Sequence, residues 1–317
     1  MKRVVVTGAF SYTGAAVARE LLARGYSVHT LTNRQPPSGA YRITWAPLRF
    51  DIAELVEQFA GADAFVNTFW VRLPHGGQSF ETAVAQSRLL LEAAVRTSVR
   101  VVHVSVSNAA SGRNLGYYRG KAEVEEAIRA AGAAYAIVRP TLIVGPADVL
   151  TNNIAWFLRR SPFFPLPGGG RYRLQPVTLR DVGLVVVDAL EQSDNLEVDA
   201  AGQEVFTFAD YVRLLADACA VRRIIVPVPR ALALAALRIG GTFLRDVVLT
   251  DEELLGLEQE LLLSHEPPRG RESVTAWLKA QGVMLGHHYV NDLGRHFESG
   301  ATRAILDPVS LKPLAPW

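Results

Sequence analysis

Short apolar runs alternate with amphipathic segments along the first part of the chain. The runs are rich in β-branched residues and predict strands at 2–6, 26–32, 43–50, 64–68, 101–106 and 134–139. Apolar residues recur at helical spacing in the segments between them, which predicts helices at 13–24, 52–60, 80–97 and 120–131. The third strand is the weakest prediction, because Pro47 interrupts it.

Strands that alternate with helices predict crossover units and a parallel sheet. The first run, Val4-Val5-Val6, is continuously apolar, as expected of a strand buried on both faces. The predicted fold class is therefore α/β, a doubly wound parallel sheet with helices on both faces. The expected core covers residues 1–202.

The pattern changes after Pro146. Residues 161–176 are rich in proline, glycine and aromatics, and we interpret them as a loop with a short hairpin. Residues 151–176 as a whole are expected to form an excursion from the core. Helical spacing returns at 182–190, 210–220, 227–244 and 251–263. These patterns predict a smaller, mainly helical C-terminal region at 203–300, followed by an extended tail at 301–317 that contains several prolines.

Composition narrows the class of protein. The chain has 317 residues, 49% of them apolar, and a net charge of +2 from 33 basic and 31 acidic residues, which argues against a nucleic-acid-binding surface. The single cysteine, Cys219, excludes an internal disulfide framework and a cysteine metal cluster, and the adjacent His287 and His288 point apart, so no metal site is expected. With no signal peptide or membrane span in the pattern, we expect a cytoplasmic protein.

The stretch VTGAFSYTG, residues 6–14, joins the first strand to the first helix, where a dinucleotide fingerprint belongs. Gly8 allows a tight turn, Gly14 allows close packing of helix on sheet, and the helix N-terminus offers N–H groups to a pyrophosphate. Ser11 stands where a middle glycine is usual and is expected to offer its hydroxyl instead; a purely structural turn is the alternative. The predicted cofactor-binding residues of this loop are Gly8, Phe10, Ser11, Tyr12, Thr13 and Gly14.

The end of the second strand bears on the type of cofactor. Asn33 and Arg34 stand there, and no acidic residue follows until Asp51. A carboxylate at this place binds the ribose of NAD, whereas an arginine accommodates the 2′-phosphate of NADP, so NADP(H) is favoured over NAD(H). Arg34 as a solvated loop residue is the alternative. Asp51 is expected either to accept from the adenine amino group or to cap the next helix.

A second group of residues follows the fifth strand. Tyr117 and Lys121 are four positions apart, so they share one helix face. An ammonium group beside a phenol lowers the phenol's pKa, and such a tyrosine exchanges a proton with a substrate oxygen while hydride moves to or from a nicotinamide. Ser105 and Ser107 close the preceding strand, where a serine hydroxyl would hold the same oxygen.

These motifs resemble short-chain dehydrogenases/reductases of the extended or atypical kind. The matching pieces are VTGAFSYTG, VHVSVSN (102–108), YYRGKAEVE (117–125), VRPTLIVGP (138–146) and QPVTLRDV (175–182). Within that superfamily the chain is most similar to the NAD(P)-binding branch related to an accessory subunit of respiratory complex I. The resemblance implies that residues 1–202 are an NAD(P)-binding Rossmann core and that 203–300 cap the substrate.

The resemblance also implies roles for individual residues. The catalytic set would be Ser107, with Ser105 as the alternative, Tyr117 as general acid/base, and Lys121, which would also contact the nicotinamide ribose. Pro140 and Thr141 would line the nicotinamide end, and Thr68 would contact cofactor. The chain departs from the family at Ser11, at the bulky loop Thr68-Phe69-Trp70, and at Ala83, where many members have asparagine.

Substrate contacts are predicted at Phe69, Trp70, Asn153 and Trp156, with plain packing as the alternative for the last two. The scarcity of charge among these residues suggests an apolar or aromatic carbonyl compound. The leading hypothesis is an NADPH-dependent reductase with a small-molecule substrate. The alternatives are a catalytically silent NADP(H)-binding assembly or sensor module, with a homodimer or protein partner, and an epimerase or dehydratase that retains its cofactor.

Overall fold

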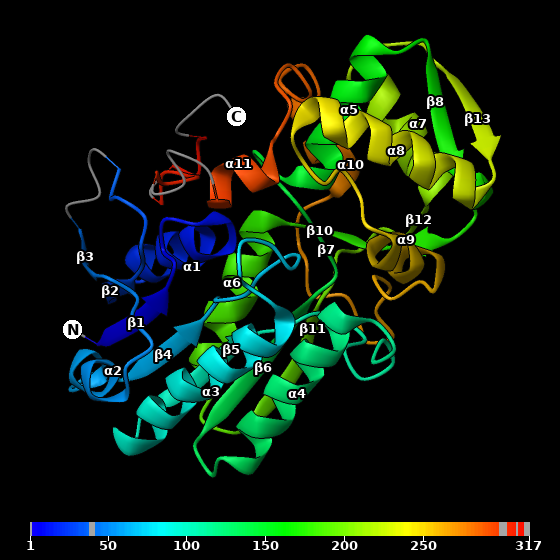
Figure 1. Ribbon diagram of the computed structural model, residues 1–317. Helices are drawn as coiled ribbons and strands as arrows, with labels where there is room; N and C mark the ends of the chain where they lie inside the picture. Colours follow the sequence, from blue (N-terminus) through cyan, green and yellow to red (C-terminus); the bar gives the residue numbers. More distant parts are fainter. Residues whose placement is uncertain (1, 38–41, 298–302, 309, 314–317) are drawn as a thin grey trace. The chain divides into compact units, whose positions relative to one another are not determined.

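Figure 1 shows the computed structural model of the chain, which describes residues 2–37, 42–297, 303–308 and 310–313. The chain folds into two compact units. The first contains Met1–Pro140, Leu179–Ala200 and Thr302–Leu314, and the second contains Thr141–Thr178, Ala201–Ala301 and Ala315–Trp317. The expected core, 1–202, thus contributes the segment from Thr141 to Thr178 to the second unit.

A seven-stranded parallel sheet forms the centre of the first unit, in the order β11-β6-β5-β4-β1-β2-β3 (Figure 1). The strands are β1 (Arg3–Thr7), β2 (Ser27–Leu31), β3 (Ile43–Ala46), β4 (Ala64–Asn67), β5 (Arg100–Val104), β6 (Tyr135–Pro140) and β11 (Leu196–Ala200). The chain reverses direction across the sheet between β1 and β4, and such a switch point opens a crevice at the carboxyl ends of the strands. The predicted doubly wound α/β fold is confirmed.

Helices cover both faces of this sheet. On one face α1 (Tyr12–Ala23) packs against α6 (Leu179–Leu190), and on the other α3 (Phe80–Arg96) lies between α2 (Ile52–Phe59) and α4 (Gly116–Ala130) (Figure 1). Val4, Val5 and Val6 of β1 have no exposed surface, as their unbroken apolar run predicts. The central strand thus leads directly into the glycine-rich loop from a fully buried position.

The second unit combines three pairs of short strands with helices. The pairs are β7 (Leu142–Val144) with β10 (Pro176–Thr178), β8 (Phe163–Pro167) with β13 (Ile224–Val228), and β9 (Arg173–Leu174) with β12 (Phe206–Thr207). The α-helices are α5 (Val149–Arg160), α7 (Phe208–Ala218), α8 (Arg230–Leu244), α9 (Asp251–Glu258), α10 (Val274–Gln281) and α11 (Asp292–Phe297), and Gly168–Gly170 form a 3₁₀ turn. Tyr211, Leu158 and Leu215 centre its apolar core.

Two expectations for the second unit were wrong. The segment 161–176 forms no hairpin, because its three strands each pair with a different, distant strand. The helix expected from residue 227 begins at Arg230, and Ile224–Val228 is a strand. Ile224, Ile225 and Val226 are β-branched, and such residues favour a strand over a helix.

Residues of the expected C-terminal tail fold back within the first unit. Ala304, Ile305 and Leu306 are buried, and Leu306 forms a β-bridge with Pro313. The backbone N–H of Ile305 donates to the carbonyl of Phe10, 2.8 Å away, in the glycine-rich loop. The described part of this segment is therefore packed rather than trailing.

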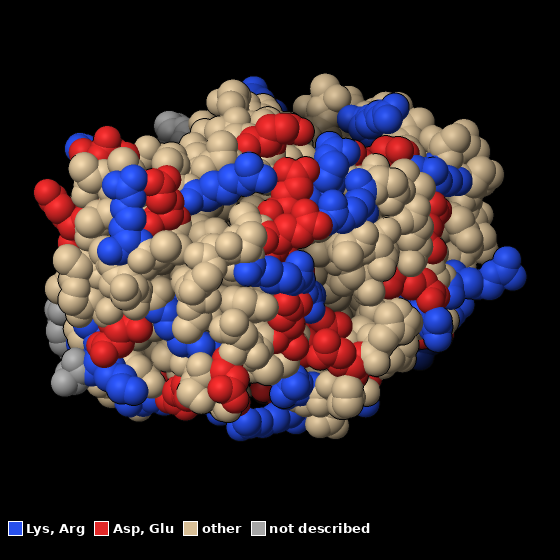
Figure 2. Space-filling model, turned by 90° about the horizontal axis from the view of Figure 1, so that it is seen from below, with Lys and Arg blue, Asp and Glu red and all other residues tan. Residues whose placement is uncertain are grey.

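Charges of both signs lie side by side on the face seen in Figure 2, without a large patch of one sign. This agrees with the balanced composition of the whole chain. None of the helices in the described residues has both the length and the apolar character that a membrane crossing requires.

Candidate active site

The glycine-rich loop has a backbone that only small residues allow at two places. Gly8 leaves β1 with φ +70°, a left-handed conformation that suits glycine. A Cβ on Gly14 would lie 2.1 Å from the carbonyl oxygen of Gly8, so α1 approaches the loop at a distance that excludes any side chain. The two glycines therefore hold the start of α1 against the end of β1, as predicted from the sequence.

Ser11 closes the turn of the loop. Its hydroxyl donates to the carbonyl of Gly8 at 2.5 Å, and its contact with a phosphate stays a prediction. Ser11 occupies the N-cap position of α1 but makes no side-chain cap bond, unlike Asp51 and Ser79 before α2 and α3. The Ser11 side chain therefore does not bond the N–H groups in the first turn of α1, which includes Tyr12, Thr13 and Gly14.

The residues expected at the adenosine end all lie in the first unit. The Asn33 side chain bonds the backbone N–H and carbonyl of Leu48 at 3.0 and 3.3 Å, which links the loops after β2 and β3. Arg34 donates from Nη1 to the carbonyl of Arg303 at 2.8 Å. Asp51 accepts from the N–H groups of Ala53 and Glu54, both at 3.0 Å, so the capping alternative holds for this residue.

The loop after β4 is tied to the end of β1. The Thr68 hydroxyl donates to the carbonyl of Thr7, and the N–H groups of Thr68 and Phe69 donate to the Thr7 hydroxyl at 2.9 and 3.1 Å. The Phe69 ring packs against Phe50, with 5.1 Å between ring centroids. These bonds fix the position of Trp70, the next residue.

The two candidate serines after β5 differ in their surroundings. Ser105 donates its hydroxyl to Oε1 of Glu125 at 2.6 Å, and both residues are buried. Ser107 has no exposed surface, and its backbone N–H donates to the carbonyl of Pro140 at 2.9 Å. The Ser105 hydroxyl is thus committed to a carboxylate, which favours Ser107 as the serine of the catalytic set.

Tyr117 and Lys121 come together around one indole ring. Both lie on α4, and Trp70 packs edge-on against Tyr117 with 6.1 Å between centroids, while Nζ of Lys121 lies 4.5 Å from the Trp70 ring centroid. The Lys121 amine also donates to the carbonyl of Val104 at 2.8 Å. Among the described residues, the buried indole N–H of Trp70 has no hydrogen-bond partner, which leaves a donor inside this cluster.

Burial controls the charge of Lys121. The residue is 3% exposed, and this desolvation lowers the pKa of its amine from 10.5 to about 7, although the charge of Glu125 acts in the opposite direction. Burial also lowers the pKa of His103 well below its ordinary value, with the charges of Lys121 and Arg139 as further causes. An amine with a pKa near 7 can gain and lose a proton at neutral pH.

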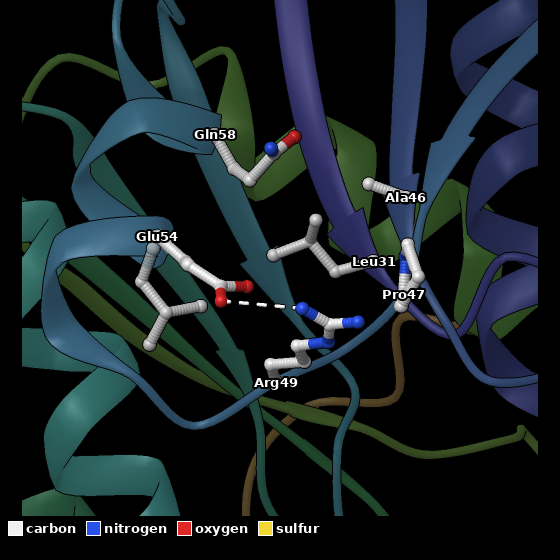
Figure 3. A pocket seen from close by; sticks show the side chains of 7 residues that line it. Leu31, Ala46, Pro47, Arg49, Glu54 and Gln58 are labelled. Atoms are coloured by element: carbon white, nitrogen blue, oxygen red, sulfur yellow. Dashed lines mark hydrogen bonds and ion pairs between the residues drawn. The ribbon is translucent and has the colours of Figure 1, made fainter.

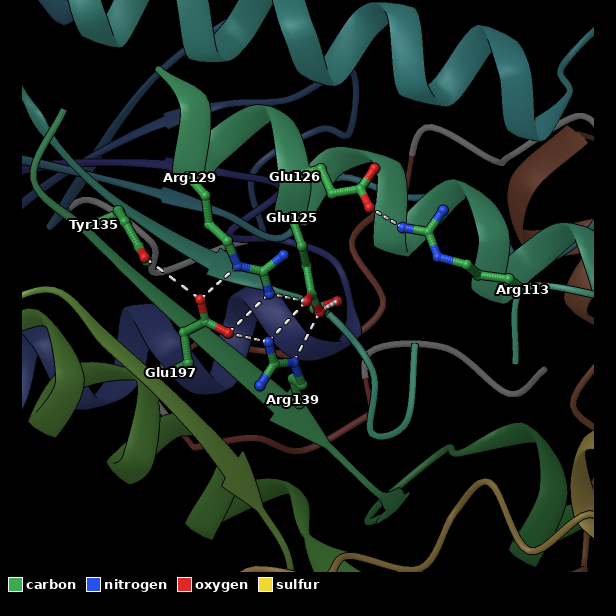
Figure 4. A network of polar contacts seen from close by, with 8 residues as sticks. Arg113, Glu125, Glu126, Arg129, Tyr135, Arg139 and Glu197 are labelled. Atoms are coloured by element: carbon green, nitrogen blue, oxygen red, sulfur yellow. Dashed lines mark hydrogen bonds and ion pairs between the residues drawn. The ribbon is translucent and has the colours of Figure 1, made fainter. Parts of the chain in front are cut away.

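A charge network surrounds the buried Glu125, one turn of α4 after Lys121, and sequence reasoning missed it (Figure 4). Glu125 on α4 accepts from Arg139 of β6 at 2.8 and 2.9 Å and from Arg129 at 2.9 Å, and Glu197 of β11 pairs with both arginines. Glu125 follows Lys121 by four positions, so their shared helix face was the one signal available in the sequence.

The remaining predicted residues lie in the second unit, apart from Pro140, which ends β6. The Thr141 hydroxyl donates to the carbonyl of Gln175. The Asn153 side chain accepts from the N–H of Val290 and donates to its carbonyl, at 2.8 and 2.9 Å, and Trp156 packs against Tyr289 with centroids 5.3 Å apart. Asn153 and Trp156 thus hold the segment around Val290, the packing alternative, and their contact with substrate stays a prediction.

A small pocket opens between α2 and the carboxyl ends of β2 and β3 (Figure 3). Arg49 and Glu54 form an ion pair of 3.3 Å at its wall, and it is otherwise lined by Leu31, Ala46, Pro47, Leu55 and Gln58. Its volume of about 130 Å³ is below the usual 300–1,000 Å³ of ligand pockets. It contains none of the predicted site residues and is too small for a dinucleotide.

The first unit nevertheless suits a dinucleotide. Gly8 and Gly14 form a backbone cradle that a Cβ would fill, and the first turn of α1 has no side-chain cap. N–H groups at such a helix start, at the carboxyl edge of a parallel sheet, bind pyrophosphate. The Trp70 indole N–H supplies a further buried donor beside Tyr117 and Lys121.

Comparison with known proteins agrees with this geometry. The model of the NAD dependent epimerase/dehydratase family matches residues 4–200. The chain belongs to this family. It therefore has the NAD(P)-binding fold that the sequence resemblance implied, with the glycine-rich loop and the Tyr117–Lys121 pair inside the matched range.

Two curated relatives match part of the chain. Subunit 9 of the NADH dehydrogenase [ubiquinone] 1 alpha subcomplex, mitochondrial, from Arabidopsis thaliana is 29% identical over 203 residues, which are 61% of this chain and 50% of that protein. A ceramide reductase from Caulobacter vibrioides is 27% identical over 172 residues, 51% of this chain and 53% of that protein. The chain thus spans about half the length of the curated relatives it matches.

Among solved structures, the chain is similar to the NADPH-dependent quinone oxidoreductase QOR2 of Escherichia coli, solved with NADPH. The TM-score is 0.72 at 16% identity, covering 87% of this chain and 99% of that one. At this identity the likeness establishes the fold, and it extends the agreement to residues beyond the range that the family model matches.

Proposed function

We propose that the chain is an NADPH-dependent oxidoreductase of the short-chain type, which transfers hydride to a carbonyl compound with Tyr117 as proton donor. The meeting of Tyr117 and Lys121 around Trp70 carries the proposal, because it puts a phenol and an amine of pKa about 7 in one cluster. Relatives named as a ceramide reductase and a quinone oxidoreductase support a reduction.

Each residue of the set has a chemical task in this proposal. Bound NADPH supplies the hydride. The Tyr117 hydroxyl gives its proton to the carbonyl oxygen, while the Lys121 amine, when protonated, favours the resulting phenolate. Ser107 holds the same oxygen, since the Ser105 hydroxyl donates to Glu125. The backbone N–H groups that start α1 hold the pyrophosphate.

The test is the rate of NADPH oxidation with a panel of ketones and quinones. Tyr117→Phe is expected to lower kcat by about 10²–10⁴-fold, the usual contribution of a positioned general acid. Tyr118→Phe is the matched control, because Tyr118 is the next residue of α4 and packs against Tyr117, and we expect its kcat to stay within a few-fold of the parent. Equal rates for the parent and Tyr117→Phe would overturn the assignment of Tyr117.

Arg34 is proposed to select NADPH. It lies in the loop after β2, behind Thr32 and Asn33, where an arginine accommodates the 2′-phosphate. Arg34→Ala is expected to raise the Kd for NADPH by about tenfold and leave the Kd for NADH unchanged, as loss of one charge-assisted contact implies. Arg49→Ala, which removes an arginine from the loop after β3, is the control. A parallel loss for both cofactors would contradict the assignment.

A catalytically silent NADP(H)-binding module is the second candidate, and Trp70 favours it. Its ring lies over the Lys121 amine, where it hinders access to that group. The match to a respiratory-complex subunit points the same way. Tight NADPH binding without turnover, together with a co-purifying protein partner, would identify this function. An epimerase or dehydratase would instead convert substrate with no net consumption of NADPH.

A further inference from the structure

Helix α8 in the second unit exposes an unusual amount of apolar surface. Phe243 is 85% exposed, Leu232 64% and Ile239 63%. These three residues are separated by seven and four positions, so they lie on one face of the helix, together with the exposed Ala235 and Ala236. We call these five residues the outer face of α8.

The opposite side of α8 is the one that holds the helix in place. Ala233, Leu234 and Gly241 are its buried residues, and α8 packs beside β8. The apolar residues of the outer face are thus additional to those that the fold uses. Large apolar side chains gathered on one face mark a surface that binds another molecule.

The sequence from the residues before β13 to the end of α8 is rich in arginine. Residues 222–245 contain five arginines and no acidic residue. Arg230 pairs with Asp251 and Glu258 of α9, and Arg223 donates to backbone carbonyls of the neighbouring Leu158 and Arg159.

Three arginines keep their charge available. Arg222, Arg238 and Arg245 are exposed, and no acidic group in the described part of the chain forms an ion pair with them. Arg238 precedes Ile239 and lies at the side of the outer face. When the outer face is buried in an apolar layer, the long Arg238 side chain can extend to the polar layer next to it. Helix α8 therefore combines an apolar face with basic residues, Arg238 within it and Arg245 at its C-cap, while Arg222 lies before β13.

We propose that α8 docks the protein on the surface of an anionic lipid bilayer. An apolar face that enters the boundary between headgroups and acyl chains, bordered by basic residues, is typical of interfacial helices. The 15 residues of α8 are fewer than the roughly 20 needed to span a bilayer, so the helix lies along the surface.

A second copy of the chain fits this surface less well. In a symmetric dimer the same patch meets itself, so the arginines of both copies would be brought into one interface. Like charges brought together across an interface oppose association. An anionic lipid surface fits both the apolar face and the basic residues of this region. The inference does not depend on the proposed oxidoreductase activity.

The experiment is flotation of the full-length protein with vesicles. Vesicles of phosphatidylcholine with about one-third phosphatidylglycerol are compared with vesicles of phosphatidylcholine alone. We expect binding to the first at least about tenfold tighter than to the second, and weaker as salt rises, since about three arginines contribute. Equal binding to both, or no binding, would overturn the proposal.

Double variants test whether the outer face of α8 and its arginines bind the vesicles. Ile239→Ser with Phe243→Ser is expected to weaken vesicle binding by at least about tenfold, because two apolar side chains leave the membrane. Arg238→Gln with Arg245→Gln is expected to weaken binding to the anionic vesicles alone, by roughly fivefold per arginine. The matched control is Val283→Ser with Met284→Ser, which removes two similarly exposed apolar residues of the same unit, 67% and 74% exposed.

Two further outcomes would each contradict the lipid assignment. One is a loss of binding in the control that equals the loss in the α8 variants. The other is a concentration-dependent dimer in light scattering that Ile239→Ser with Phe243→Ser abolishes, without vesicle binding by the parent. Unchanged unfolding temperatures, expected because the substituted side chains are exposed, ensure that lost binding reports on the surface rather than on folding.

Discussion

Two cations lie beside Glu125 of helix α4, the buried Lys121 on the helix itself and the largely enclosed Arg139 on β6, and their surroundings affect them in opposite ways. Burial on its own would lower the pKa of Arg139, but hydrogen bonds and charge from Glu125 and Glu197 raise it above its ordinary value. Lys121, one turn before Glu125, donates to a backbone carbonyl and lies under the Trp70 ring, and burial lowers its pKa to about 7. One cation is neutralised by carboxylates, and the other is not.

The difference separates a structural charge from a chemically useful one. The Arg139 guanidinium keeps its proton at every physiological pH and, through Glu125 and Glu197, links α4, β6 and β11. An amine whose pKa lies near 7 gains and loses a proton under working conditions. Residues on a single face of α4 thus serve the fold at one turn and the candidate reaction at the next.

Removing Glu125 has the largest expected effect on this comparison. Glu125→Ala leaves Arg139, whose side chain is 15% exposed, with only Glu197 as a counter-charge, and removing the buried partner of an ion pair lowers the free energy of unfolding by about 3 kcal/mol. Urea unfolding at neutral pH measures the loss. It also removes the acceptor of the Ser105 hydroxyl.

The neighbouring Glu126 provides the control. It pairs with Arg113 on the surface, and both side chains are substantially exposed. Glu126→Ala is therefore expected to change the free energy of unfolding by less than about 1 kcal/mol. If Glu125→Ala and Glu126→Ala lower the free energy of unfolding by a similar amount, the Glu125 network is no stronger than a surface ion pair. Arg139 would then not be a structural charge, and its contrast with Lys121 would be wrong.

The pH dependence of stability tests the other cation. The folded pKa of Lys121 is about 7 and its unfolded value is about 10.5, so between these values the unfolded chain binds more protons. The free energy of unfolding then rises with pH from 7 towards 10, by at most about 1.4 kcal/mol per pH unit, and the penalty of burying the charge is fully present below pH 7.

Lys121→Met removes this dependence, because methionine fills similar space without a titrating group. Urea unfolding of both proteins at pH 7, 8 and 9 should show a smaller slope for the variant, and Lys279→Met, at an exposed position of α10, should keep the parent slope. Parallel slopes for parent and Lys121→Met would show that the Lys121 amine titrates no differently in the folded and unfolded states.

Trp70 gives the smallest of the three expected effects. Trp70→Ala lets water reach the Lys121 amine, and since burial is the main cause of its low pKa, that pKa is expected to rise by about one unit. Titration of the lysine side-chain carbons by NMR measures the change. Phe80→Ala removes a ring that stacks on Trp70 and should leave the Lys121 pKa in place. A fall in the pKa would mean that the indole ring, rather than dehydration, controls this amine.

Local patterns were enough to predict the sheet and the parts of the site that one element determines. The apolar run of β1, the two glycines that hold α1, and the four-residue spacing of Tyr117 and Lys121 each depend on residues close in sequence. The family match confirmed the cofactor fold, while the roles of the individual site residues stay predictions.

Features that depend on distant residues were missed. The strand pairs of the second unit join segments such as Phe163–Pro167 and Ile224–Val228, whose partners no local pattern indicates. Trp70 reaches Lys121 only because the loop after β4 is tied to β1. The Ser11 hydroxyl had several acceptors in principle, and only the three-dimensional turn selects the carbonyl of Gly8.

The bond between Ile305 and Phe10 has a consequence for the timing of folding. Ile305, which donates to the carbonyl of Phe10, is translated long after Phe10. A nascent chain can therefore assemble the strands of the first unit before its glycine-rich loop receives this bond. A chain interrupted between Ala200 and Ile305 would contain all seven strands of the sheet but would lack this bond to the glycine-rich loop.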